Sequence, residues 1–449
     1  MLISREKNFY RTFFRLYIAL VLQNVITLSV NLLDNVMLGA YSETALSGVA
    51  IVNQIQFVYQ QVLMALGDGM VIFCSQYWGK KQTEPIKKIA SVSMKTGLCV
   101  AVLLFTAVTL FPGWIAGLFT TDLPIQQQAV EYMSIIRFSY LFFAVTILLL
   151  AAMRSVEVVK IALYLSVMTL FVNCGVNYLL IFGNLGMPEM GAKGAAIGTL
   201  VARIVECLVC IWYVAVKEKR LALHLKDYLT GDWSLARDYF KVTVPMIVVQ
   251  ALWGLNTALQ TVILGRMTAA AIAANSVASS LFMLVKSMAV GASATASVII
   301  GKTIGSGDMK KVKEYAKTLQ VLFVYIGIVA GCILFLIRMP ILTIYDLSAE
   351  TKAMANSFLI ILSVICMTMS YQMPTNTGII RGGGSPNFVV KLDLISIWCI
   401  VLPVSFIMAF VVKASPIVVV CCLNADQVFK CIPAFIKVNY GHWAKKLTR

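Results

Sequence analysis

The stretch ITLSVNLLDNVMLG, residues 26–39, sets how the rest of the chain is interpreted. It lies near the end of a long apolar run that begins after Arg15, and it contains a single carboxylate, Asp34. An aspartate inside a membrane-spanning helix costs roughly 2.5 to 3.5 kcal/mol on insertion scales, so by default it marks an ion or substrate path. The alternative is that Asp34 stays in water, because it lies only about 8 Å inside the outer end of the helix.

Composition places the chain among polytopic membrane proteins. Of its 449 residues, 60% are apolar and only 13% are charged, and the mean hydropathy is +0.86. An ordinary soluble protein does not have this balance. The net charge of +17 raises nucleic acid as a partner, but the Lys and Arg residues fall in every second loop, as in the cytoplasmic loops of membrane proteins. We therefore expect a membrane lipid environment and no nucleic acid.

The chain contains twelve apolar segments, each long enough to cross a bilayer, and charged residues mark their ends. The first has no small-residue cleavage pattern and is followed by many others, so it is a span and not a signal peptide. If the amino terminus is inside, most of the 37 basic residues fall on the cytoplasmic side. The sequence thus predicts a multi-pass protein of the inner (plasma) membrane with both termini cytoplasmic. The predicted spans are residues 16–39, 45–74, 92–113, 127–153, 161–183, 194–216, 242–265, 270–300, 318–338, 353–378, 391–413 and 415–436.

A linker and an internal repeat divide the chain into two lobes. At an offset of 226 residues, DNVMLG (34–39) lies over QTVILG (260–265), and Gly79 lies over Gly305. Because six spans separate the two copies, both cross the membrane in the same sense, as in transporters whose site lies between or within two lobes. We predict an all-α fold with an amino-terminal lobe (1–216), a cytoplasmic linker (217–241) and a carboxyl-terminal lobe (242–449).

Polar side chains of the fifth and sixth spans lie at the depth of Asp34. Asn173 and Asn177 are at i and i+4 on one helical face, and so are Ala195 and Thr199. Counted from the span ends, they come within roughly 8 Å of Asp34 in depth. A carboxylate, two amide oxygens, a hydroxyl and a backbone carbonyl would form an oxygen cage for a monovalent cation or a proton. Alternatively, these side chains only make interhelical hydrogen bonds, worth about 0.6 kcal/mol each.

Four motifs stand out along the chain. They are Asp34 followed by V-x-x-G, N-x-x-x-N-Y-L-L-I-F-G (173–183), G-A-x-G-A-A-I-G-T (191–199) and GIIRGGG (378–384). Taken together they resemble the multidrug and toxic compound extrusion (MATE) family, and the similarity covers essentially the whole chain. In that family the first-helix aspartate and polar positions of helices five and six form a cation site. The resemblance implies that Asp34, Asn173, Asn177, Ala195 through its carbonyl, and Thr199 hold H⁺ or Na⁺, with no other cofactor.

The carboxyl-terminal lobe departs from the family pattern. Relatives of the NorM type carry a glutamate in span seven and an aspartate in span ten. Here span seven has no acid, and Thr375 stands near the position of the second acid. Asp393, near the cytoplasmic end of span eleven, is the candidate acid of this lobe, with a solvated helix start as the alternative. Asp426 is a further acid in the same lobe. The sequence leaves open whether this lobe holds a second ion.

The sequence pattern for a substrate site is weaker than the pattern for the cation site. A cavity lined by Met and aromatic side chains would suit flat apolar cations through dispersion and cation–π contacts, although the same residues are also ordinary core or lipid-facing side chains. Arg203 and Glu206, at i and i+3, are interpreted as a structural ion pair. The candidate residues of the substrate cavity are Trp253, Asn256, Gln260, Tyr371, Lys286 and Asp68.

The sequence therefore predicts a secondary active multidrug exporter. An inward H⁺ or Na⁺ gradient would drive expulsion of amphipathic organic cations, drugs or dyes by alternating access, and the protein is expected to act as a monomer. The alternative is a lipid-linked oligosaccharide flippase of the same superfamily. Its pyrophosphate substrate would call for several basic side chains in the cavity, where only Arg203, Lys286, Arg137 and Lys193 qualify.

Two further classes fit the sequence less well. A membrane-embedded enzyme would need a His-Asp or Ser-His-Asp constellation, but the two histidines, His224 and His442, fall in loops far apart. A major-facilitator carrier also has twelve helices, but it should show a G-x-x-x-D-R-x-G-R-type loop after span two. This chain has YWGKKQTEPIKK (77–88) there. We therefore expect a transporter and not an enzyme.

Overall fold

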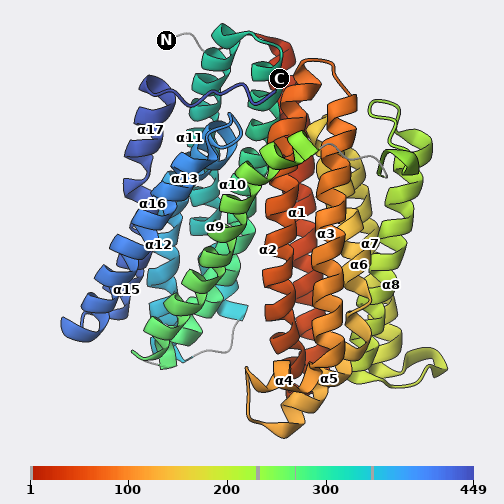
Figure 1. Ribbon diagram of the computed structural model, residues 1–449. Helices are drawn as coiled ribbons and strands as arrows, with labels where there is room; N and C mark the ends of the chain where they lie inside the picture. Colours follow the sequence, from red (N-terminus) through yellow and green to blue (C-terminus); the bar gives the residue numbers. More distant parts are fainter. Residues whose placement is uncertain (1–3, 229–232, 268, 345–347, 449) are drawn as a thin grey trace. The chain divides into compact units, whose positions relative to one another are not determined.

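The computed structural model describes residues 4–228, 233–267, 269–344 and 348–448, and within these ranges it contains helices and no strand (Figure 1). Residues 229–232 of the predicted linker lie outside the described residues. The first eight α-helices are α1 (Lys7–Tyr41), α2 (Glu43–Gly79), α3 (Glu84–Leu110), α4 (Pro112–Gly117), α5 (Leu123–Ile136), α6 (Ser139–Ser155), α7 (Lys160–Phe182) and α8 (Gly191–Trp212). They are followed by α9 (Trp233–Gly265), α10 (Ala269–Gly305), α11 (Met309–Ile344), α12 (Ala349–Met373), α13 (Pro386–Asp393), α14 (Leu402–Phe406), α15 (Pro416–Leu423), α16 (Asp426–Phe429) and α17 (Cys431–Tyr440).

The predicted number of membrane spans is confirmed. Among the described residues, eleven helical runs are long and apolar enough to cross a bilayer, and the bent pair α5 and α6 makes twelve. The fourth span is therefore not one straight helix, because it turns by 57° between α5 and α6. At this turn the Phe138 and Tyr140 N–H groups donate to carbonyls three residues earlier, those of Ile135 and Arg137. Such tightened turns redirect a helix.

The chain forms two compact units, which are described separately. The first unit comprises Leu22–Cys74 and Gln82–Thr243, and the second comprises Met1–Val21, Ser75–Lys81 and Val244–Arg449. Helices α1 and α2 each contribute to both units. The lobe boundaries at residues 216 and 242 stay a prediction of the sequence.

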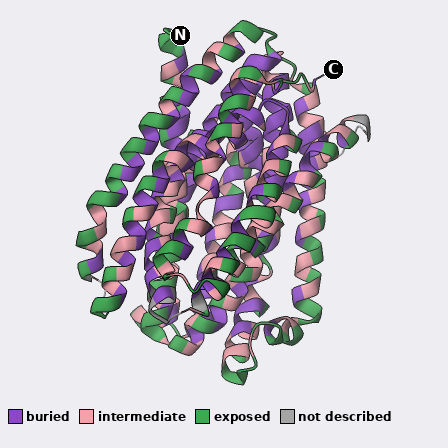
Figure 2. Cartoon of the chain, turned by 90° about the vertical axis from the view of Figure 1, so that its left-hand side faces the viewer, coloured by how far each residue is buried: buried purple, intermediate pink, exposed green. Residues whose placement is uncertain are grey.

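In the first unit, α7 packs against α8, and α6 packs against both α3 and α8. Buried tyrosines tie these helices to neighbouring backbone. Tyr239 donates to the carbonyl of Leu66 (2.8 Å), and Tyr59 donates to the carbonyl of Tyr140 (2.7 Å). Large apolar side chains such as Phe171 remain exposed on the outer faces, which is the usual surface of helices that meet lipid. Figure 2 shows this division, with buried residues on the inner sides of the helices.

In the second unit, α10 packs against α11 and α12, and a core of buried residues joins α10, α12 and α15. Several spans here leave α-helical geometry. The α12 span continues as a π-helix, η4 (Pro374–Ile380), and the next span contains the π-helices η5 (Leu394–Val401) and η6 (Ile407–Val411). The last span is divided into α15, α16 and α17. Such departures are frequent at functional sites.

Glycines let α2 and α10 approach closely within the second unit. A Cβ at Gly79 would overlap the carbonyl oxygen of Lys302, and a Cβ at Gly305 would overlap that of Gln76. Gly79 and Gly305 are the pair that the sequence repeat superimposes. Equivalent positions of the two copies thus meet the backbone of the partner helix, which only glycine permits.

We predict that Gly305→Ala lowers the free energy of unfolding by about 1–3 kcal/mol, because the added methyl group overpacks this contact. Thermal unfolding of the purified protein in detergent measures the effect. The matched control is Gly113→Ala, whose added Cβ meets no atom within 4 Å. Equal midpoints for the two variants would show that the α2–α10 contact does not require glycine.

Candidate functional site

Asp34 lies in the last two turns of α1 and is held by an amide of α7. The Asn177 Nδ2 donates to Asp34 Oδ1 at 2.6 Å and also lies 3.3 Å from Asn173 Oδ1. The Asn173 Nδ2 in turn donates to Thr199 Oγ1 of α8 at 3.4 Å. Both asparagines are buried, whereas Asp34 is half-buried. The structure therefore brings together four of the five residues predicted for the cation site, in one hydrogen-bonded chain.

The side-chain amide oxygen of Asn177 has no hydrogen-bond donor among the described residues. Asn177 Oδ1 is buried and accepts no hydrogen bond from the part of the chain that the structure describes. It lies against Gly198, where an added Cβ would overlap it. A buried oxygen without a partner is costly.

Ala195, the fifth predicted residue, is buried one turn before Thr199 on α8. In a regular α-helix the carbonyl oxygen of residue 195 accepts the N–H of residue 199 and keeps one lone pair. Ala195 therefore borders the group but is not among its side-chain hydrogen bonds.

Two neighbours of Asp34 were missed by the sequence analysis. Tyr132 of α5 is buried, and its hydroxyl interacts with Thr199 and with the charge of Asp34. The positive charge of Arg203 also acts on Asp34. The i+4 spacing of Arg203 from Thr199 was a signal in the sequence that could have identified it. No sequence signal identified Tyr132, because the position of α5 depends on the bend that follows it.

The Arg203–Glu206 ion pair is confirmed. Arg203 Nη1 donates to Glu206 Oε2 at 2.8 Å, and its guanidinium lies 4.7 Å from the ring centre of Phe143. Arg203 is thus already paired with a carboxylate of its own helix.

A cavity of about 660 Å³ lies where α1 ends and α8 begins. Tyr41 lines it and terminates α1 seven residues beyond Asp34. Glu131, Glu189 and Lys193 add charges to the wall, and Lys193 lies 3.8 Å from Glu131. The cavity therefore borders the same helix ends that carry the Asp34 group.

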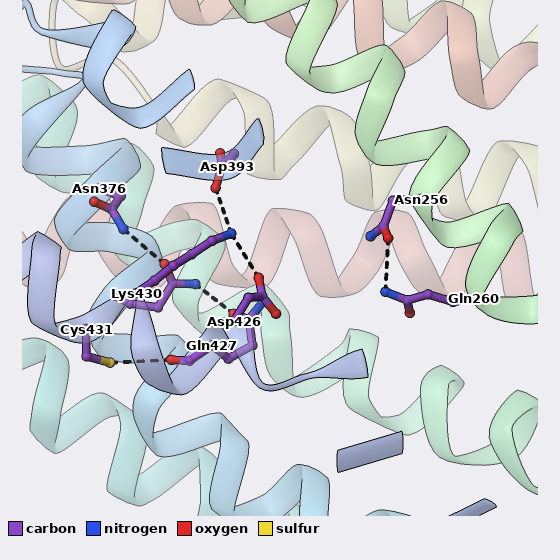
Figure 3. Close-up of polar contacts among 9 residues, drawn as sticks. Asn256, Gln260, Asn376, Asp393, Asp426, Gln427, Lys430 and Cys431 are labelled. Atoms are coloured by element: carbon purple, nitrogen blue, oxygen red, sulfur yellow. Dashed lines mark hydrogen bonds and ion pairs between the residues drawn. The ribbon is translucent and has the colours of Figure 1, made fainter. Parts of the chain in front are cut away.

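The six candidates for a substrate cavity are divided between the two units. In the second unit, Lys286 lies 4.7 Å from the ring centre of Trp253, and Gln260 donates to Asn256 at 3.4 Å (Figure 3). Tyr371 instead donates to Gln320 of α11 at 2.8 Å. In the first unit, Asp68 is paired with Arg154 at 2.7 Å.

Asp393, the candidate acid of the carboxyl-terminal lobe, lies in an ion pair. Lys430 Nζ donates to Asp393 Oδ1 at 2.8 Å and to Asp426 Oδ2 at 2.9 Å (Figure 3). Asp393 keeps 24% of its side chain exposed, but Lys430 keeps only 3%. The sequence analysis missed Lys430, because a basic residue there also fits the cytoplasmic end of the last span.

Twelve spans with polar groups held inside them are typical of a membrane transporter. The family model MatE matches residues 19–179 and 245–407. These stretches begin 226 residues apart, which is the offset of the predicted repeat. The chain therefore belongs to the MatE family and is an efflux transporter of the MATE type, as its motifs indicated.

Individual relatives agree with this assignment. The chain is 25% identical over 430 residues to a probable multidrug resistance protein NorM of Thermotoga maritima, covering 95% of this chain and 92% of that protein. It is 23% identical over 382 residues to the uncharacterized transporter YisQ of Bacillus subtilis, covering 83% and 82%. Its fold matches a mutant of the Vibrio cholerae MATE transporter VcmN, with a TM-score of 0.88, 16% identity and 98% coverage of each chain. A MOP superfamily transporter from Pyrococcus furiosus matches with a TM-score of 0.87 and 16% identity, over 95% of this chain and 94% of that one.

We predict that Gly198→Ala reduces efflux about tenfold or more while expression stays near the wild-type level. The added methyl group would push the Asn177 amide away from Asp34, and a hydrogen bond to a charged group is worth about 1.5–3 kcal/mol. Dye efflux from cells, normalised to the amount of protein in the membrane, measures the effect. Gly175→Ala on α7 is the control, because its added Cβ meets nothing within 4 Å. Efflux at the wild-type rate in both variants would contradict the prediction.

Proposed function

We propose that this protein is a cation-coupled multidrug exporter in which Asp34 binds the driving ion. The observation that carries the proposal is the bond between Asp34 and Asn177, beside an amide oxygen with no donor. The carboxylate is held in place by a neutral amide, so its charge remains available to a cation. The coupling ion is H⁺ or Na⁺, bound among Asp34, Asn173, Asn177 and Thr199 with the Ala195 carbonyl beside them.

The geometry gives the two ions different requirements. The Asn177 amide presents its hydrogen to Asp34. A sodium ion needs oxygen ligands, so it would require this amide to turn its Oδ1 toward the carboxylate. A proton on the free oxygen of Asp34 requires no such turn. With either ion, the contacts between α1 and α7 differ between the ion-bound and the ion-free state of the Asp34 group. A ligand shifts a conformational equilibrium only through such a difference.

The names of the relatives support drugs as substrates, since several are called multidrug resistance proteins. Amphipathic organic cations are the class of drug that we propose. They do not favour a lipid-linked oligosaccharide flippase. The transporter relatives also argue against an enzyme. We further propose a plasma-membrane location with both termini in the cytoplasm, because the basic residues gather in alternate loops. A monomer in lipid, without a nucleic-acid partner, remains our expectation.

The proposal predicts that Asp34→Asn abolishes coupled efflux and leaves membrane insertion intact. The amide has nearly the same shape as the carboxylate but can neither hold a proton nor balance the charge of a sodium ion. Drug accumulation in energised cells measures the loss. Asp122→Asn is the matched control, because Asp122 is an exposed acid before α5. An Asp34→Asn protein that exports at the wild-type rate would remove the proposal.

Ion coupling itself is tested in vesicles that contain the purified protein. We expect dye transport under a proton gradient alone or a sodium gradient alone, and no transport in the Asp34→Asn variant under either. Dye movement that is equally fast with both gradients collapsed would show that the protein is not a cation antiporter.

A further inference from the structure

A buried lysine lies between two aspartates in the second unit, apart from the Asp34 group. Lys430 Nζ donates to Asp393 at 2.8 Å and to Asp426 at 2.9 Å, and Figure 3 shows the ammonium between the two carboxylates. The Lys430 side chain is 3% exposed and that of Asp426 is 6% exposed. Charges buried this deeply persist only when they are paired. An ammonium group thus occupies the position that a small cation would take between these acids.

The backbone is irregular around this group. Asp393 is the last residue of α13, directly before the π-helix η5. Asp426 begins α16, which has only four residues, and Lys430 stands between α16 and α17. Changes from α-helical to other helical hydrogen bonding are frequent at functional sites. The three charged residues therefore lie where the helical hydrogen bonding of two contacting spans changes.

A chain of amides also points its donors at Asp426. Asn376 of η4 donates to Gln372 at 3.1 Å, and Gln372 donates to Gln427 at 2.7 Å. Gln427 donates to Asp426 Oδ2 at 2.9 Å, the oxygen that also accepts from Lys430. Each amide is thus oriented by the next, and the last one stabilises the ionised form of Asp426. This arrangement favours a permanent cation partner over a proton on that carboxylate.

The ion pairs favour a single positive charge at this place. Lys430 pairs with both Asp393 and Asp426, whereas the ammonium of Lys286 lies 4.7 Å from the ring centre of Trp253. If the Lys430 ammonium were removed, both carboxylates would lose this shared partner, and one monovalent cation could replace it.

We propose that Lys430 is the resident cation of a monovalent-cation site formed by Asp393 and Asp426. Its ammonium fills the site permanently, so this unit takes up no exchangeable H⁺ or Na⁺. Without that ammonium, the same carboxylates bind a small primary ammonium ion or sodium. The inference concerns ligand chemistry in this unit, and it stands or falls independently of coupling at Asp34.

The test uses the full-length protein carrying Asp34→Asn, so that the first unit does not respond to cations. Thermal unfolding midpoints are compared in choline, sodium and ethylammonium chloride at equal ionic strength. We expect the Asp34→Asn parent to unfold at one temperature in all three salts. Adding Lys430→Ala should lower the midpoint in choline, and ethylammonium or sodium should restore most of the loss in a saturable way. Adding Lys446→Ala, an exposed control, should create no such response.

A triple variant with Asp34→Asn, Lys430→Ala and Asp393→Asn identifies the site, because it should lose the response to ethylammonium and sodium. The proposal is overturned if the Lys430→Ala protein responds equally to all three salts. A second measurement does not depend on how well that variant folds. The Asp34→Asn parent should bind no radioactive sodium, and saturable binding by that parent would also overturn the proposal.

Discussion

The hydrogen bond from Asn177 to Asp34 is the interaction on which the arrangement of the first unit depends. A carboxylate within a spanning helix needs a hydrogen-bond or ion-pair partner. The partner of Asp34 is a neutral amide and not a Lys or Arg side chain. The other intramembrane acids differ. Asp68 has Arg154, Glu206 has Arg203, and Asp393 shares Lys430 with Asp426. Among the ion pairs of the described residues, Asp34 takes part in none. It is therefore the acid to which we assign the driving ion in the proposed function.

The two repeat copies place different chemistry at equivalent positions. Asp34 lies over Gln260 in the repeat, and Gln260 donates to Asn256, one turn earlier on α9. The second copy thus has a neutral amide pair where the first has a carboxylate. Its acids lie instead in the last two spans, where Asp393 and Asp426 share Lys430. The two copies therefore hold their intramembrane acids with different partners.

The sequence predicted the spans and most of the Asp34 group for a simple reason. Helical rise gives the depth of a residue, and i, i+4 spacing gives its face, so Asn173, Asn177 and Thr199 could be placed at the level of Asp34. Tyr132 and Lys430 could not be found in this way. Their positions depend on a bend after α5 and on breaks around α16, which hydropathy does not reveal. The substrate residues stay a prediction, because composition does not say which helices are neighbours.

The cavity at the ends of α1 and α8 extends the argument about Asp34 to its surroundings. Its wall holds two carboxylates and one ammonium, and Lys193 lies beside Glu131. Glu189 is left as the unbalanced charge of the lining, so the cavity carries a net negative charge. An excess of negative charge in a cleft attracts cations. Under the proposed function, a cation that approached Asp34 from this side would meet this negative charge first. The proposed coupling then needs only a shift in helix packing to admit the cation to the carboxylate.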